Sequence, residues 1–317
     1  MRCILILNTN NVFSIVEKGN IQMFFTTEEY ARRVDNCKKV MINQGIDTLL
    51  VYSDYLRQYN VRYLSGYTYF PSPMGASVFI LSLEGDPTLL VDNISSRAMD
   101  KITKDSWVKD IRTSKTWLKK PWTSGVLEVL IELTVKALQE RETSNQRIGI
   151  VGYDFMPNTM LENLRRAFVG WNFIDLTEPV DRLRMVKSGL EVEMIRRTAR
   201  IADAGLEVFM ENLRVGKKEY EIGSEVFREI YGKGVEEIYG FWVRSGPKNT
   251  EYHGIPSFTK RGVKDGDLVW IDMGMSRDGY FADTARSTIA GRVAENRRRL
   301  CDVCLTALES AFRAMRP

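Results

Sequence analysis

Two aspartates flank a turn signal in the C-terminal third of the sequence. Asp272 and Asp283 lie on either side of the Asp-Gly dipeptide at 278–279, which favours a two-residue β-hairpin turn. Counting outward from such a turn, Asp272 pairs with Ala285, and Asp283 projects from the same face of the hairpin. Diagonal neighbours lie about 7–8 Å apart at Cα, so both carboxylates could reach one divalent cation. A three-residue loop would place them on opposite faces, so the prediction depends on the turn.

The sequence leaves two interpretations of these aspartates open. Asp272 lies in the apolar run Val-Trp-Ile-Asp-Met, where burying a carboxylate without a partner would be costly. That environment favours a metal ligand. Alternatively, one or both aspartates face solvent near a strand end, or pair with Arg286.

His253 is the only histidine of the chain, so any mechanism or metal site uses one imidazole at most. It lies in a turn-rich stretch, Asn-Thr-Glu-Tyr-His-Gly-Ile-Pro over 249–256, between two predicted strands. A loop imidazole can serve as a ligand, a general acid or base, or a substrate contact. A surface or capping histidine is the alternative.

Other common catalytic patterns are absent or weak. Cys301 and Cys304 have C-x-x-C spacing inside a helical pattern, and zinc would need two further ligands, so two free thiols are expected. The sequence contains neither a G-x-S-x-G nucleophile elbow nor a phosphate-binding glycine loop. The four cysteines are too few and too scattered for a disulfide framework, which indicates a reducing compartment.

Composition limits the class of protein. The 317 residues, of which 44% are hydrophobic and 27% charged, suit an ordinary globular chain of about two domains. A net charge of +4 is too mild to argue for nucleic-acid binding. Residues 64–83 carry no charge but contain prolines and glycines, so no membrane span is expected there.

Strand and helix patterns alternate from residue 26 onward, which predicts α/β architecture. Ser188 and Glu191 have the spacing of a capping box that begins a long helix ending before Gly216. The apolar stripe of that helix is expected at Val192, Ile195, Ala199, Ala202, Leu206 and Met210. The other expected helices cover 26–44, 124–141, 158–167, 218–232 and 295–314. The expected strands cover 46–52, 77–83, 87–91, 107–111, 147–151, 171–176, 239–245, 267–275 and 279–290.

Four phrases, in this order, resemble the pita-bread hydrolases: prolidase, aminopeptidase P, creatinase and, more distantly, methionine aminopeptidase. Residues 26–68, with Asn-Val-Arg-Tyr-Leu-Ser-Gly-Tyr at their end, resemble the N-terminal domain of that family. Residues 183–191 resemble the start of its catalytic domain, and 245–253 resemble the segment with its substrate-side histidine. Residues 263–287 resemble the region of its first two metal ligands.

The resemblance implies a mixed α/β (α+β) chain in two domains. Residues 23–180 are expected to form a creatinase-like N-terminal domain, and residues 181–317 the first half of a pita-bread peptidase domain. Residues 1–22 lie outside the resemblance; because Met23 comes just before a helix start, we expect them to be a poorly ordered extension or the result of an upstream start in the gene model.

The resemblance also implies that Asp272 binds one divalent ion, that Asp283 bridges two, and that His253 contacts the scissile amide. The ions, manganese or cobalt with zinc as a further candidate, would activate a water that attacks the carbonyl before a proline. Peptide or small amide substrates, a homodimer and a cytoplasmic location are expected from the same resemblance.

The sequence departs from the family pattern after Asp283. In the family, a metal-binding histidine and two metal-binding glutamates follow, whereas here no histidine follows His253 and the sequence stops at Pro317. We therefore expect an incomplete peptidase domain and a polypeptide that is inactive as given. A creatinase-like C–N hydrolase that needs no metal, and a non-catalytic peptide-binding protein on the same fold, are the alternatives.

Overall fold

The structure is a computed structural model of the chain, and it describes residues 25–54, 56–67, 75–91, 106–113, 125–141, 145–247 and 257–316. The chain forms two compact units that divide between Val186 and Lys187. The described residues contain no helix that is both long enough and apolar enough to cross a membrane.

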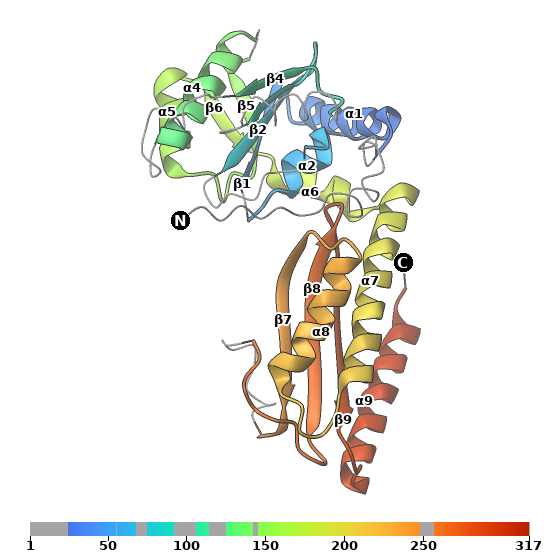
Figure 1. The fold of residues 1–317 in the computed structure, drawn as a ribbon. Coiled ribbons are helices and arrows are strands. Elements are labelled where there is room, and N and C mark those ends of the chain that lie inside the picture. The colour runs from blue at the N-terminus through green and yellow to red at the C-terminus, as the bar shows by residue number, and fades with distance from the viewer. Residues whose placement is uncertain are drawn as a thin grey trace, which may run out of the picture. The chain divides into compact units, whose positions relative to one another are not determined.

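The first unit is a mixed sheet with helices on both faces (Figure 1). Its strand order is β4-β3-β2-β1-β5-β6; β2 runs antiparallel to β1 and β3, and the other neighbours are parallel. The strands are β1 (Thr48–Asp54), β2 (Ala76–Ser82), β3 (Thr88–Val91), β4 (Asp110–Thr113), β5 (Arg147–Val151) and β6 (Asn172–Asp175). The helices are α1 (Thr27–Asn43), α2 (Tyr59–Ser65), α4 (Gly125–Gln139), α5 (Asn158–Ala167) and α6 (Thr177–Met185).

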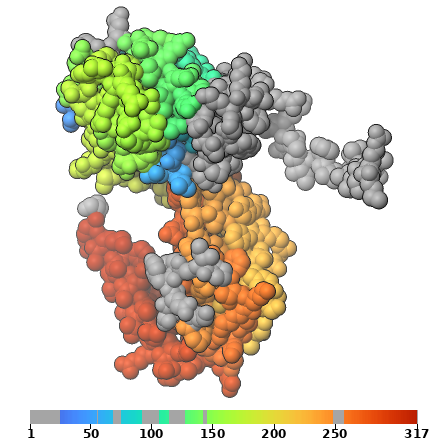
Figure 2. Space-filling model, turned by 90° about the vertical axis from the view of Figure 1, so that its left-hand side faces the viewer, coloured from blue at the N-terminus to red at the C-terminus, as the bar shows by residue number. Residues whose placement is uncertain are grey.

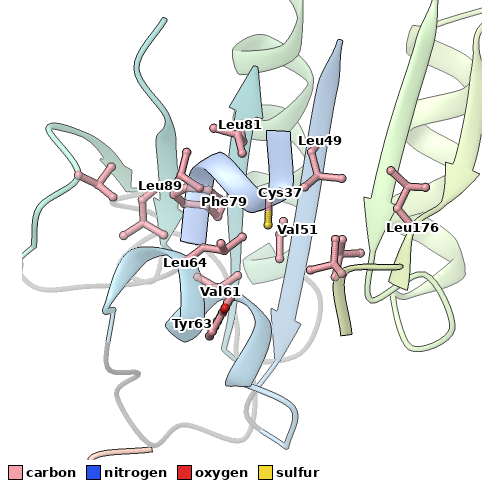
Figure 3. Packing of buried hydrophobic residues seen from close by; sticks show 14 of the residues in the cluster. Cys37, Leu49, Val51, Val61, Tyr63, Leu64, Phe79, Leu81, Leu89 and Leu176 are labelled. Carbon is pink, nitrogen blue, oxygen red and sulfur yellow. The ribbon is translucent and has the colours of Figure 1, made fainter. Parts of the chain in front are cut away.

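Strand side chains alternate between two apolar clusters, as the period of two in a strand requires. Leu49 and Val51 pack with α1, α2 and α6 on one face, whereas Leu50 packs with α4 and α5 on the other. Figure 3 shows the first cluster, with the sulfur of Cys37 from α1 directed into it. A sheet covered on both faces explains why the four inner strands, β3, β2, β1 and β5, are mostly apolar in the sequence.

Three features of this unit differ from the sequence prediction. The predicted strand at 107–111 is wrong in its start: β4 begins at Asp110, because Trp107 packs in the core and donates its indole N–H to Leu64 O at 3.0 Å. Helix α2 was not predicted, and it ends at Gly66 with φ +72°. Helix α6 was not predicted either, because Pro179 and its charged neighbours resemble a linker, although proline is tolerated in a first helical turn.

The second unit is a three-stranded antiparallel sheet, in the order β7-β8-β9, with two helices packed on one face. Its strands are β7 (Glu237–Ser245), β8 (Leu268–Arg277) and β9 (Tyr280–Ile289), and its helices are α7 (Gly189–Asn212), α8 (Glu219–Gly232) and α9 (Glu295–Ala314). The predicted capping box is confirmed: Ser188 Oγ accepts from Glu191 N at 3.2 Å, and Glu191 Oε2 accepts from Ser188 N at 2.8 Å.

The buried face of α7 is rotated from the predicted stripe. Ala202 and Leu206 are buried as predicted, but Met210 is 51% exposed. The other buried positions are Glu191, Met194, Thr198, Ile201, Gly205 and Phe209. Polar residues contribute to this face because Glu191 and Thr198 both form hydrogen bonds with Tyr280, the first residue of β9. Gly205 contributes because it lies against Ile230 and Met273. Hydrophobicity alone does not reveal these contacts.

Helix α9 matches its predicted bounds but buries none of its residues. Figure 2 shows its side chains, in red, at the surface of this unit. Its exposed apolar side chains include Leu300, Val303, Leu305, Leu308 and Phe312.

Candidate metal centre

The β8–β9 hairpin has the register that its turn dipeptide predicts. Arg277 pairs with Tyr280 across the turn, and both turn residues have positive φ, +55° at Asp278 and +77° at Gly279. These angles are those of a two-residue type I′ turn, in which the second position favours glycine.

This register places both candidate carboxylates on one face of the sheet. Asp272 lies opposite Ala285, and Asp283 lies opposite Gly274, two residues along the same face. The two aspartates are therefore diagonal neighbours, about 7–8 Å apart at Cα. The prediction that Asp272 and Asp283 share a face is confirmed, whereas their role as metal ligands stays a prediction.

The face that carries the aspartates is the one that α7 and α8 leave open. The core face of β8 is formed by Val269, Ile271 and Met273, all fully buried. On the opposite face Asp272 is half-buried and Asp283 is exposed. The argument from a costly buried carboxylate was therefore wrong for Asp272, because alternation turns this residue away from the apolar core.

Two glycines leave the sheet bare beside the aspartates. Gly240 of β7 pairs with Gly274 of β8. A Cβ atom on Gly274 would lie 3.7 Å from Asp283 Oδ1, so this carboxylate lies over the glycine backbone. A Cβ on Gly240 would overlap the Trp242 ring, so the indole covers the neighbouring position. Asp283 and the Trp242 ring are thus neighbours of the two glycines on this face.

Arg286 was expected, in one interpretation, to pair with Asp272 or Asp283. Its guanidinium donates to the carbonyl oxygen of Ala285 at 2.8 Å and to Thr284 Oγ1 at 3.3 Å. The interpretation that Arg286 neutralises the aspartates is therefore not supported by its contacts.

The remaining sequence candidates lie elsewhere. His253 falls in 248–256, outside the described residues. Cys301 and Cys304 are both free thiols on α9, as expected. Cys37 is also free, and burial raises the pKa of its thiol to about 12, which disfavours the reactive thiolate at neutral pH.

The carboxylate oxygens of Asp272 and Asp283 are suitable ligands for a divalent cation, but two side chains supply few of the ligands that such a cation needs. Carboxylate oxygens suit manganese and similar hard cations, and the bare glycine backbone leaves space beside Asp283. Among the described residues, no group of three or more His, Cys, Asp or Glu side chains could hold a metal ion. Asp272 and Asp283 are therefore the described side chains that would contribute, and further ligands would have to come from elsewhere.

Sequence reasoning missed the part that β7 plays in this area. Gly240 and Trp242 reach the aspartates only through the β7–β8 pairing, which contains an irregularity between Ile238 and Gly240. Local sequence carries no signal for such a register shift. The turn dipeptide, in contrast, is a local signal, which is why the β8–β9 pairing was predictable.

Comparison with known proteins identifies both units. Residues 33–186 match the creatinase/prolidase N-terminal domain, and residues 193–317 match metallopeptidase family M24. These two matches follow the order of the two compact units.

Curated relatives and solved structures agree with this assignment. An uncharacterized hydrolase/peptidase of Sinorhizobium fredii is 26% identical over 92% of this chain and 73% of its own length. The Xaa-Pro dipeptidase of Pyrococcus furiosus is 26% identical over 90% of this chain and 72% of its own length. The crystal structure of the prolidase from Pyrococcus horikoshii has the same fold, with a TM-score of 0.72 at 22% identity over 90% of this chain and 73% of that one.

The chain thus spans about seven tenths of the length of these proteins. Its open sheet face carries two aspartates in the unit that matches the peptidase family. The first unit of the chain thus matches the creatinase/prolidase N-terminal domain and the second matches metallopeptidase family M24, so the chain resembles the pita-bread hydrolases in both units.

Proposed function

We propose that this chain carries part of the active site of a hydrolase that cleaves the amide bond before proline. In this proposal Asp272 and Asp283 are ligands of divalent metal, and His253 contacts the substrate. The observation that supports it most strongly is the placement of both carboxylates on the open face of one hairpin, in the family-matched unit. The Xaa-Pro dipeptidase of Pyrococcus furiosus and the Xaa-Pro aminopeptidase of Escherichia coli, 30% identical over 171 residues, support the substrate class.

A divalent ion held by these carboxylates would polarise a substrate carbonyl and lower the pKa of a bound water. The chain's own part is to hold the two carboxylates at fixed separation on a rigid hairpin. The half-exposed Trp242 beside them offers an apolar contact for a substrate. Manganese or cobalt, peptide substrates, a homodimer and a cytoplasmic location are part of the proposal through the family resemblance.

For the polypeptide of residues 1–317 we expect weak metal binding and no measurable hydrolysis. Hard divalent cations take about six or more oxygen ligands in proteins, and two carboxylates on an open face supply few of them. Asp283 is exposed, so water competes with any ligand there.

The proposal is tested by proline release in the presence of manganese. The protein in the form that its gene encodes is incubated with Ala-Pro, and with Pro-Ala as the control peptide. We expect proline from Ala-Pro only, lost in Asp272→Asn and on chelation of the metal, and no release by the polypeptide 1–317. Hydrolysis that survives chelation and both aspartate substitutions would contradict the metal-dependent proposal and support the metal-free C–N hydrolase.

A further inference from the structure

Glu191, in the first turn of α7, has a buried carboxylate whose two oxygens serve different parts of the unit. Its side chain is 3% exposed. Oε2 accepts from the backbone N–H of Ser188 at 2.8 Å, which completes the capping box. Oε1 accepts from the hydroxyl of Tyr280 at 3.0 Å, 89 residues further along the chain. One oxygen therefore caps the helix, and the other binds the start of β9.

A second residue of α7 binds the backbone of the same tyrosine. Thr198 follows Glu191 by about two helical turns, so both side chains project from one face of the helix. Thr198 is fully buried, and its hydroxyl lies 3.1 Å from Tyr280 O and 3.2 Å from Met194 O, so its hydrogen is shared between the two carbonyls. Helix α7 thus contacts Tyr280 through both its side chain and its backbone.

Tyr280 is the first residue of the strand that carries Asp283. Side chains alternate along β9, so Asp283 faces the open side while Tyr280 faces α7. The next two residues on the side of α7, Ala282 and Thr284, are small and offer little surface for packing β9 against the helix. In the described part of this unit β9 pairs with β8 alone. The polar contacts of Tyr280 therefore hold β9 against α7 where apolar packing is weak.

The carboxylate of Asp283 has no comparable anchor of its own. Among the described residues, none donates a hydrogen bond to it. The side chain is exposed and lies over the backbone of Gly274. Its distance from Asp272 therefore follows from the path of the β9 backbone. The turn sets the register of that backbone, but strand twist varies widely at one register, most of all in narrow sheets.

We propose that Tyr280 is a positioning residue for Asp283: held by Glu191 and Thr198, it fixes the path of β9 behind the open face and so sets the separation of the two candidate carboxylates. This inference rests on the proposed function for the purpose of that separation. Ligand oxygens lie about 2.0–2.6 Å from a hard divalent cation, so an ion shared by two carboxylates tolerates little change in their distance. Loss of the tether should weaken metal binding although both ligands remain.

The first test needs no metal. Tyr280→Phe removes the hydroxyl and keeps the ring, and Thr198→Val removes the other donor at similar volume. The side-chain carboxyl carbon of Asp283 is followed by NMR and identified by its absence in Asp283→Asn. In both variants we expect this signal to shift or broaden, and amide hydrogen exchange of β9 to become about tenfold faster.

Tyr231→Phe is the matched control. Tyr231 lies on α8 of the same unit, is 51% exposed, and stacks its ring on Phe227. Its hydroxyl bonds to none of the residues that the structure describes, so this variant removes a tyrosine hydroxyl without removing a contact. We expect the Asp283 signal and the exchange of β9 to match the wild type. Changes equal to those in Tyr280→Phe would overturn the inference.

The second test separates positioning from stability. Manganese binding to the polypeptide 1–317 is measured by electron paramagnetic resonance in Tyr280→Phe, in Asp283→Asn and in the double variant. We expect Tyr280→Phe to weaken binding by about threefold or more when Asp283 is present, and to have no further effect in Asp283→Asn, because the hydroxyl acts through that carboxylate. Its effect on urea unfolding should be the same in both backgrounds. Equal weakening of binding in both backgrounds would indicate general loosening and overturn the inference.

An unmoved Asp283 signal with unchanged β9 exchange in both Tyr280→Phe and Thr198→Val would overturn the inference as well. The proposed function fails in a different way. If the wild type shows no saturable manganese binding, the two aspartates lose their role as metal ligands, whereas the metal-free carboxyl signal still decides whether Tyr280 positions Asp283.

Discussion

The turn at the tip of the β8–β9 hairpin decides on which face Asp283 lies, so a substitution there tests the structural basis of the candidate site. Gly279 has φ +77°, in the left-handed region. Gly279→Ala keeps the chain length and adds one methyl group. Gly232→Ala is the matched control: this glycine, the last residue of α8, has an ordinary φ, and a Cβ atom added to it would meet no heavy atom within 4 Å.

The expected free-energy changes have opposite signs. An L-residue in the left-handed region costs about 1–2 kcal/mol. Alanine also removes conformational freedom from the unfolded chain, which is worth about 0.4–1 kcal/mol. Gly279→Ala should therefore destabilise the second unit by about 1 kcal/mol. Gly232→Ala has only the second contribution and better helix propensity, so it should stabilise the unit by about 0.5–1 kcal/mol.

Amide hydrogen exchange of β8 and β9, followed by mass spectrometry, measures both effects in one unit. We expect exchange about fivefold faster in Gly279→Ala and slower than wild type in Gly232→Ala. The pairing of Arg277 with Tyr280 should persist, because a slip by one residue would turn Asp283 onto the apolar face. A Gly279→Ala protein as stable as wild type, or two variants with equal effects, would refute the turn geometry.

Two further predictions follow from groups with shifted pKa values. Burial raises the pKa of the Cys37 thiol to about 12, so Cys37 should resist alkylation in the folded protein at pH 8, whereas Cys301 and Cys304 should react. Peptide mapping by mass spectrometry measures which cysteines are labelled. Rapid labelling of Cys37 in the folded protein would contradict its burial. Asp267→Asn should destabilise the second unit by about 1 kcal/mol at pH 7, allowing for solvent screening. Because the folded-state pKa of Asp267 is lowered, its contribution is present above its unfolded pKa of about 3.9 and is lost as the pH falls through the lower folded value. The difference in free energy of unfolding between Asp267→Asn and the wild type, measured with urea, should thus narrow below about pH 4. A difference independent of pH would contradict the ion pair between Asp267 and Arg261.

The features that could be predicted from sequence are those with local signals. The dipeptide at 278–279 predicted the β8–β9 register because a two-residue turn leaves one pairing. Ser188 and Glu191 predicted the start of α7 for the same reason, since a capping box is complete within one turn. The inner strands of the first unit were predictable because a sheet covered on both faces requires apolar runs there.

The features that could not be predicted depend on distant partners. The polar contacts of Thr198 and the close approach of helices at Gly205 rotate the buried face of α7. The burial of Glu219 could not be predicted, because the Ser245 and Thr259 hydroxyls that donate to its carboxylate lie 26 and 40 residues away. The half-exposure of Asp272 depends on which face of the sheet the helices cover, and an alternating pattern alone does not specify that choice.

The most direct test of the account is manganese binding to the polypeptide 1–317, measured by the loss of the free-ion signal in electron paramagnetic resonance. Asp272→Asn and Asp283→Asn each remove one proposed ligand, and Asp278→Asn, at the turn of the same hairpin, changes charge equally without touching the site. We predict saturable binding that weakens by about tenfold or more in the first two variants and stays near wild type in the third. Equal binding by all four proteins would contradict the assignment of Asp272 and Asp283 as metal ligands.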